Sequence, residues 1–139
     1  MDRIENCISF LTGKAAQQIA RRAREKLSAW SVTPSQYAVL RVLWDEDGQA
    51  GAAIGARLLI DSATITGVID RLEGSGLLQR RADGGDRRVH RLFLTAPGRA
   101  LQAPLDAAMD QLNAEVADEL ADAAPALWDG LRRLGDIRK

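Results

Sequence analysis

Apolar residues recur at every third or fourth position along the first thirty residues of the chain. They run from Ile4 through Ile19 to Trp30, and this spacing predicts a helix with one buried face. The opposite face carries five basic residues, which are interpreted as a solvated surface: Lys14, Arg21, Arg22, Arg24 and Lys26.

A second helix is predicted to begin at Pro34. Thr33 is a capping residue, Pro34 suits the first helical position, and Gln36 can return a hydrogen bond to the cap. The helical pattern ends at the acidic run 45–48, whose spacing lacks the alternating ligands of a calcium loop. We therefore interpret this run as a solvated loop.

Two further helices with a turn between them are predicted from the next apolar groups. Residues 52–58 form a short amphipathic pattern, and Asp61-Ser62 can cap the helix that follows. The buried stripe of that helix is Ile65, Val68, Ile69 and Leu72, which leaves small and hydroxyl-bearing residues on its outer face. Such residues permit close approach to bases and phosphates.

Two runs with the lengths of hairpin strands follow, at 77–81 and 89–94. Gly84-Gly85 gives their connection the backbone freedom of a tight tip, and Arg87 and Arg88 place two cations there. A plain solvated hairpin would have the same pattern. In the order helix, turn, helix and hairpin, however, the segments predict a winged helix-turn-helix, and an arginine at its tip suits a narrow minor groove of DNA.

The last part of the chain is again helical. Thr95 can cap a long helix with Pro97 in its first turn, and Pro104 predicts a bend within it. A break at 123–125 precedes a final helix with Leu127, Trp128, Leu131 and Leu134. We thus expect a mainly α fold of about six helices with a small β-hairpin wing, as a single domain over 1–139. The winged helix-turn-helix lobe that would bind DNA would span 32–98, and the helices of 1–31 and 99–139 would form a homodimer.

Charge and composition limit the functional classes. The formal net charge is zero, but residues 79–91 hold five arginines and only two acids, while residues 102–131 hold seven acids and no Lys or Arg. A single cysteine and a single histidine argue against an intramolecular disulfide, a metal site and an enzyme. We see no cofactor motif, signal peptide or membrane-spanning run, so a cytoplasmic protein is expected.

The combined motifs resemble the MarR family of regulators, and the resemblance runs through nearly the whole chain. It rests on the run 60–66, Ile69-Asp70-Arg71-Leu72-Glu73, Gly76-Leu77-Leu78, Asp86-Arg87-Arg88, Leu94-Thr95 and Gly98. Membership implies a homodimeric repressor or activator that binds duplex DNA at an imperfect palindrome. The residues expected at the DNA are Ser35, Ser62, Ala63, Thr64, Thr66, Gly67, Arg71, Arg87 and Arg88.

Two details of the DNA contacts depart from the family or stay open. Many members have an arginine where this chain has Gly67, so a guanine contact from that position is unavailable. Asp86 is expected to pair with a neighbouring arginine and to leave the other for DNA; the sequence does not decide between Arg87 and Arg88.

The resemblance also implies that a small organic ligand, aromatic or phenolic, releases the repressor from DNA. Such ligands bind between the first, second and fifth helices, and the expected lining residues are Trp30, Tyr37, Arg41 and Trp44. The aromatic rings would suit a planar ligand and the guanidinium a carboxylate. Core packing explains Trp44 equally well and Trp30 better.

Two alternatives remain. One is a thiol-based peroxide-responsive regulator using Cys7, because Ile4-Glu5-Asn6 and Phe10-Leu11 resemble the organic-hydroperoxide-sensing branch of the family. That branch would place its cysteine at Ser9, about 200° around a helix from Cys7, and Gly13 and Ala23 stand near its tyrosine positions. A buried or inert Cys7 is therefore favoured. The other alternative is a winged-helix module that binds a partner protein.

Overall fold

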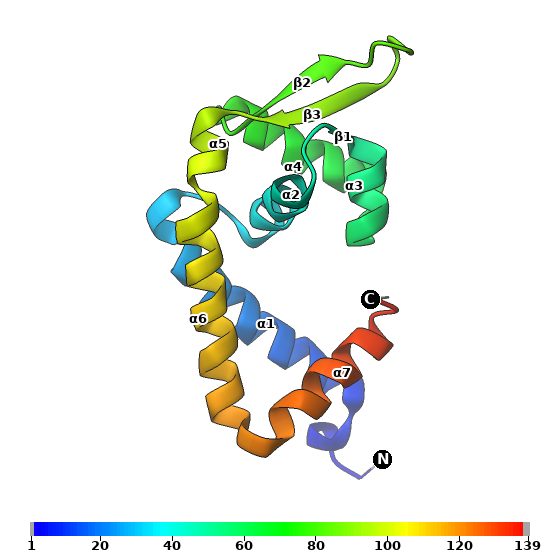
Figure 1. Cartoon of the computed structure of the whole chain (residues 1–139). Helices are drawn as coiled ribbons and strands as arrows, with labels where there is room; N and C mark the ends of the chain where they lie inside the picture. The colour runs from blue at the N-terminus through cyan, green and yellow to red at the C-terminus, as the bar shows by residue number, and fades with distance from the viewer. Residues whose placement is uncertain (1, 138–139) are drawn as a thin grey trace.

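The computed structural model describes residues 2–137 as a winged lobe joined to a frame formed by the two longest helices, α1 Ile8–Leu27 and α6 Gln102–Leu120, and by α7 Ala124–Leu134 (Figure 1). This confirms a mostly helical fold with a small antiparallel sheet. The other helices are α2 Pro34–Asp45, α3 Gly51–Leu58, α4 Ser62–Gly74 and α5 Ala96–Ala100. The strands are β1 Gln49–Ala50, β2 Leu78–Ala82 and β3 His90–Leu94, and short 3-10 turns cover Ile4–Asn6, Ser28–Trp30 and Ala121–Ala123.

The start of α2 has the predicted capping box. The backbone N–H of Gln36 donates to the Thr33 hydroxyl at 3.2 Å, and the backbone N–H of Thr33 donates to the Gln36 side chain at 2.9 Å. Two amides that the helix itself leaves unpaired are thereby satisfied. Because Gln36 is buried, this box also fixes the direction in which α2 enters the lobe.

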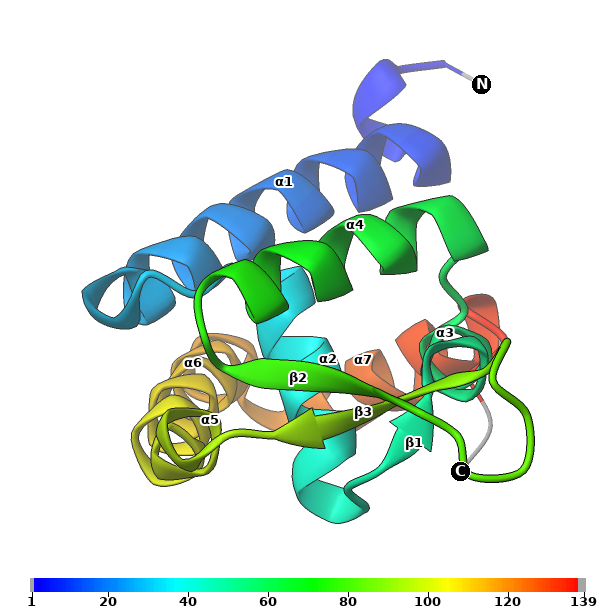
Figure 2. The ribbon, with the colours of Figure 1, turned by 90° about the horizontal axis from the view of Figure 1, so that it is seen from above.

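The core lies where α2 passes beneath α4 and the sheet (Figure 2). Leu40 and Leu43 of α2 meet Leu72 of α4 and Leu92 of β3, and all four are almost inaccessible to solvent. The same cluster includes residues of the longer helices, namely Leu27 and Leu105. The lobe therefore has no separate core, and it is packed directly onto the frame.

The hairpin strands agree with the prediction to within a residue, but the sheet has a third strand. Its order is β1-β3-β2, with Gln49 opposite Leu92 and Arg81 opposite Arg91. The acidic run before β1 is more than the solvated loop we expected. Asp47 accepts a hydrogen bond from the backbone N–H of Leu94 at 2.9 Å, so this loop is tied to the base of the wing.

Near Pro104, where a bend was expected, the helix is interrupted at the single residue Leu101, whose backbone stays in the αR region. Proline lacks the N–H that would bond to the carbonyl of Ala100, and its ring crowds that carbonyl. Accordingly, α5 ends at Ala100, and α6 begins at Gln102. Thr95 caps α5 as predicted, accepting from the backbone N–H of Gly98 at 3.1 Å.

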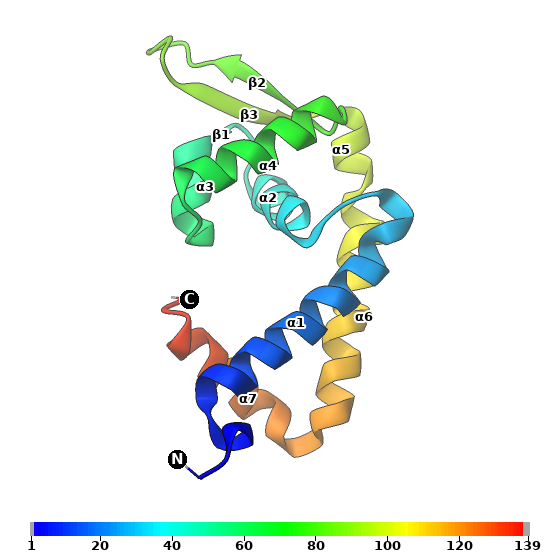
Figure 3. The same ribbon diagram turned by 180° about the vertical axis from the view of Figure 1, so that it is seen from behind.

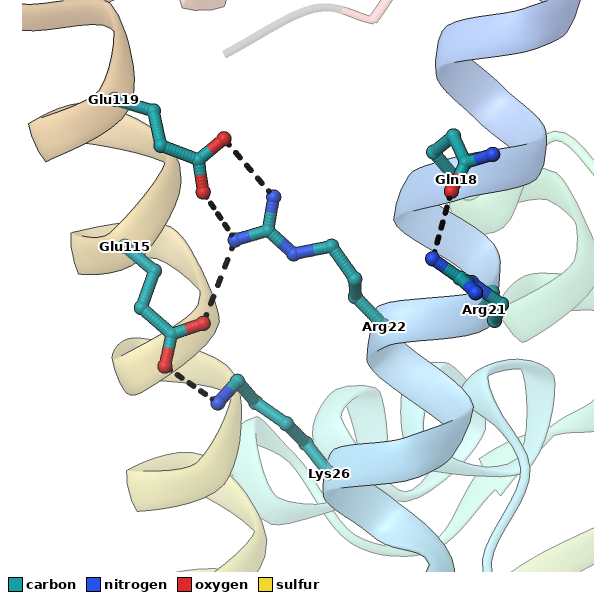
Figure 4. A network of polar contacts seen from close by, with 6 residues as sticks. All are labelled: Gln18, Arg21, Arg22, Lys26, Glu115 and Glu119. Carbon is teal, nitrogen blue, oxygen red and sulfur yellow. Dashed lines mark hydrogen bonds and ion pairs between the residues drawn. The ribbon is translucent and has the colours of Figure 1, made fainter.

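The basic face of α1 is not wholly solvated, which corrects the prediction. Arg22 lies 2.7 Å from Glu119, and Lys26 lies 2.7 Å from Glu115, both across the gap to α6 (Figure 4). Arg21 points away from this group and bonds to Gln18 of its own helix. Part of the basic face of α1 thus neutralises part of the acidic segment of α6.

The apolar face of α1 is buried only near its C-terminal end. Ala23 and Leu27 are buried, whereas Ile8 is 66% exposed, and exposed leucines also line α7. Both sets lie at the end of the molecule far from the wing (Figure 3). Within residues 2–137, no single helix has the length and apolar composition of a membrane span. Only α3 and α4 together reach them, as a pair bent by 117°.

Candidate nucleic-acid interface

The helix that would read DNA, α4, is held at its start by Asp61. One carboxylate oxygen of Asp61 accepts from the backbone N–H of Thr64 and the other from its hydroxyl, both at 2.8 Å. The bond from that backbone N–H is the main reason that the pKa of Asp61 lies below its ordinary value. A carboxylate at this position also suits the positive end of the helix dipole. The predicted cap is therefore confirmed.

The four predicted apolar residues of α4 are all buried, so the opposite face points to solvent. Its exposed members are Ser62, Ala63, Thr64, Thr66 and Arg71, with Gly67 half-buried among them. The Thr66 hydroxyl donates to the carbonyl of Ser62 at 2.7 Å, just as the Thr64 hydroxyl donates to Asp61. The hydroxyl hydrogen of each threonine is therefore already donated within the protein, and the hydroxyl oxygens remain available as hydrogen-bond acceptors toward solvent.

The base of the wing is fastened to α4 by Arg80. Its backbone N–H and its guanidinium bind the two oxygens of Glu73 at 2.8 and 2.7 Å, and the guanidinium also pairs with Asp70. The backbone bond is the main cause of a lowered pKa at Glu73. Sequence reasoning did not single out Arg80. The available signal was strand register, because Arg80 stands opposite the buried Leu92 and so lies on the face of the hairpin that meets the core.

The two candidate arginines of the wing tip, Arg87 and Arg88, differ in their contacts. Asp86 accepts from the backbone N–H of Arg88 at 2.9 Å and from its Nε at 3.3 Å. Near the base of the tip, Arg91 pairs with Asp83 at 2.7 Å. Arg87 is exposed and forms no hydrogen bond or ion pair with any of the residues 2–137. Asp86 thus does pair with an arginine, as expected, and that arginine is Arg88.

These groups share one side of the lobe. The wing tip and the start of α4 lie at the same end of it in two perpendicular views (Figures 2 and 3). Ser35 is exposed in the first turn of α2. Arg81, which sequence reasoning did not select, is also exposed on the wing, where its guanidinium lies 4.5 Å from the centre of the Phe93 ring. A helix with a small-residue face and a wing with a free cation are thus presented together.

Known proteins support this arrangement. Residues 32–90 match the family model of the MarR family. The chain is also 35% identical over 133 residues to the HTH-type transcriptional regulator TtmR of Methylorubrum extorquens (strain PA1), which covers 96% of this chain and 68% of that protein. The chain belongs to the MarR family of transcriptional regulators.

Two solved structures extend the likeness of this MarR-family chain over its whole fold. The transcriptional regulator PcaV of Streptomyces coelicolor, in complex with its natural ligand, has a TM-score of 0.86 at 27% identity, covering 98% of this chain and 96% of PcaV. Reduced AbfR bound to DNA has a TM-score of 0.80 at 28% identity, covering 96% of this chain and 93% of AbfR. TtmR and PcaV are thus named as transcriptional regulators, and AbfR is known bound to DNA.

Of the four residues expected to line a ligand site in this MarR-family chain, Tyr37 contacts Trp44, and Tyr37 and Arg41 both contact Asp106 of α6. Trp30 lines a hollow of about 370 Å³ between α1 and α6, beside Lys26 and Gln111. Tyr37 and Trp44 instead form an edge-to-face pair with ring centres 6.1 Å apart, and the Trp44 indole N–H donates to the Gly98 carbonyl at 3.0 Å. Trp44 therefore has a structural role in joining α2 to α5.

Arg41 and Tyr37 form a polar junction between α2 and α6. The Tyr37 hydroxyl donates to Asp106 at 2.9 Å, and burial is the main cause of a strongly raised pKa at Tyr37. Arg41 lies 3.0 Å from Asp45 and 3.7 Å from Asp106. Its Nη1 atom is buried and has no hydrogen-bond partner among the described residues. This donor is the one unsatisfied buried side-chain atom found in residues 2–137.

Cys7 differs from the expectation in two ways. It is half-buried rather than buried, and it precedes α1 in extended conformation, because the helix begins only at Ile8. Helical geometry therefore does not separate it from Ser9, and the two side chains lie 3.1 Å apart. The contact with Ser9 is the main cause of a lowered pKa at Cys7. Among residues 2–137 no group of metal-ligating side chains comes together.

Proposed function

We propose that this MarR-family regulator is a homodimeric repressor, not an enzyme, that binds duplex DNA at an imperfect palindrome and is released by a small organic ligand. The main observation in support is that the start of α4, with its small-residue outer face, lies at the same end of the lobe as the wing tip, the segment to which the unpaired Arg87 belongs. The DNA complex of AbfR, which shares the fold, points the same way.

The proposed contacts follow from the chemistry of each group. Thr64 and Thr66 would accept hydrogen bonds from base amino groups, since their own protons are used within α4. The methyl group of Ala63 suits a thymine methyl group, and Arg87 suits a narrow minor groove. Ser35, Ser62 and Arg88 would position the protein on phosphates, and Gly67 would permit close approach.

The proposed dimer would use the helices outside the lobe, in 1–31 and 99–139. Ile8 of α1 is 66% exposed and Leu134 of α7 is 73% exposed, and they belong to two rows of exposed apolar residues at the same end of the molecule. Patches of this kind are uncommon on monomers. A two-fold axis through that end would set two α4 helices about 34 Å apart, one turn of DNA.

The proposed ligand site lies near the polar junction of α2 and α6. The unsatisfied Nη1 of Arg41 can donate a hydrogen bond to a ligand carboxylate without first breaking a bond within the protein. Trp30 would contribute through the hollow between α1 and α6. PcaV, which has the same fold, is known in complex with its natural ligand. A ligand that prefers the DNA-free form weakens DNA binding by a certain factor, and DNA must weaken the binding of that ligand by the same factor.

Titration of the protein against the duplex upstream of its own gene tests the proposal. The measurement is made at two salt concentrations, beside a scrambled duplex of equal length and composition. Tight, salt-sensitive binding to the native duplex alone is the expected result. If both duplexes bind equally weakly, and genomic fragments also yield no preferred site, the DNA-reading function is refuted and the protein-interaction alternative is favoured. If the native duplex does bind selectively, Arg41→Gln tests the ligand site: the variant should lose the response to ligand and keep its affinity for DNA.

A further inference from the structure

In the first half of α4, the centre of the outward face carries almost no side chain. Successive residues of a helix are about 100° apart, so Ala63 and Gly67 stand opposite the buried Ile65 and Leu72. One contributes a methyl group and the other nothing. Figure 3 shows α4 lying along the outer side of the lobe, beneath the wing. The helix backbone can therefore approach a groove closely, but these two positions supply no polar group for base recognition.

A guanidinium from one turn further along fills this gap. Side chains of a helix lean toward its N-terminus, so a residue covers the surface one turn before its own position. Arg71 follows this rule, since its Nη1 lies 3.7 Å from where a Cβ on Gly67 would be. The charge of Arg71 thus lies over the bare backbone at Gly67.

Nothing in the described chain neutralises this charge. Arg71 is exposed and forms no hydrogen bond or ion pair with residues 2–137. The adjacent acid, Asp70, is held by Arg80 at the wing base. Arg71 is therefore available in a way that Arg80 and Arg88 are not, because those two are bound to carboxylates.

We propose that Arg71 reads one guanine in each half-site, and that the absence of a side chain at Gly67 leaves the space that the Arg71 guanidinium occupies. The inference rests on the proposed DNA-reading function and names the residue that sets its specificity. The planar guanidinium donates two parallel hydrogen bonds to O6 and N7 of guanine, a pattern that the other three bases do not offer in the major groove. In this chain the guanidinium that contacts guanine therefore belongs to Arg71, and it lies over Gly67 on the outward face of α4.

Selection from a randomised duplex library, followed by titration of the selected site and its single-base variants, tests the inference. The wild type is expected to prefer guanine at one position of each half-site by about 5- to 150-fold, the equivalent of ~1–3 kcal/mol. Arg71→Ala and Arg71→Lys should lose the preference at that position alone, since lysine keeps the charge but not the paired donors.

Substitutions at Gly67 supply a matched control. A Cβ there would meet Arg71 at 3.7 Å, an ordinary contact, so Gly67→Ala should keep the guanine preference. Gly67→Leu would occupy the place of the guanidinium and should reduce the preference as Arg71→Ala does. Both replacements favour helix over glycine, so neither is expected to unfold α4, and thermal melting checks this.

Three results would overturn the inference, and they are distinguishable. If the wild type selects no sequence, the DNA-reading function fails and the inference fails with it. If the wild type selects a site but Arg71→Ala keeps the same preference at every position, only the role of Arg71 is refuted. Uniform weakening by Arg71→Ala, with unchanged base preferences and a lower salt dependence, would make Arg71 a phosphate contact instead.

Discussion

Replacing the two wing-tip arginines one at a time should separate their roles. Arg87 has no partner among residues 2–137, whereas Arg88 is bound to Asp86 through its backbone N–H and its guanidinium. Each phosphate contact contributes about 0.9 to the slope of log affinity against log salt concentration. A cation in the minor groove also displaces counterions, and a dimer without Arg87 lacks two such cations, so Arg87→Ala should lower the magnitude of the slope by about 1.8.

This change has a directly measurable size. Between 50 and 200 mM salt, a slope change of about 1.8 alters the ratio of the two affinities by about 12-fold. Fluorescence anisotropy with a labelled operator, at four or more salt concentrations, gives the slope for the wild type and for each variant. Arg88→Ala is expected to change it by less than half as much, because the Arg88 charge is already partly neutralised by Asp86. An equal or larger effect of Arg88→Ala would refute this division of roles.

Three further outcomes are expected. Thr66→Val removes a hydrogen-bond acceptor and keeps the volume of the side chain. It should reduce the discrimination between operator and scrambled duplex and leave the weak non-specific affinity unchanged. If the non-specific affinity falls as well, a base-reading role for Thr66 is contradicted. The pKa of Asp61 is lowered by folding, so its contribution to stability should be present above about pH 4 and lost as the pH falls through the folded value. The difference in melting temperature between wild type and Asp61→Ala should accordingly shrink in acid, and a constant difference would contradict this. Because Ser9 lowers the pKa of Cys7, Ser9→Ala should slow alkylation of the thiol at neutral pH without changing DNA affinity, and an unchanged rate would show that this contact does not activate it.

The parts of the fold that the sequence predicted are those fixed by neighbouring residues. The capping box of Thr33 and Gln36, the Asp61 cap and the Thr95 cap each join groups three residues apart, and all three are present. The buried stripe of α4 likewise follows from a repeat within one helix. Local signals of this kind need no knowledge of what the helix packs against.

The features that the sequence missed depend on residues far apart in the chain. Asp47 bonds to the backbone of Leu94, and Arg22 pairs with Glu119, so neither contact leaves a local pattern. The strand β1 is two residues long, too short to show alternation. An error in one boundary also changed a conclusion about Cys7. The first helix was expected from Ile4, but it starts at Ile8, and the angle assumed between Cys7 and Ser9 therefore does not apply.

The pairing of charges explains how a chain with no net charge can suit a polyanion. Three arginines of the wing, Arg80, Arg88 and Arg91, are bound to acids of this chain, and these pairs hold the wing in place. Arg71, Arg81 and Arg87 have no acid partner among residues 2–137. A cation that is already paired with an acid of this chain is expected to release fewer counterions from DNA, so few strong phosphate contacts per half-site are expected. Since phosphate contacts carry no sequence information, specificity is expected to come from base reading by α4. Net charge is therefore a poor guide to this function, whereas the partners of each arginine are a direct one.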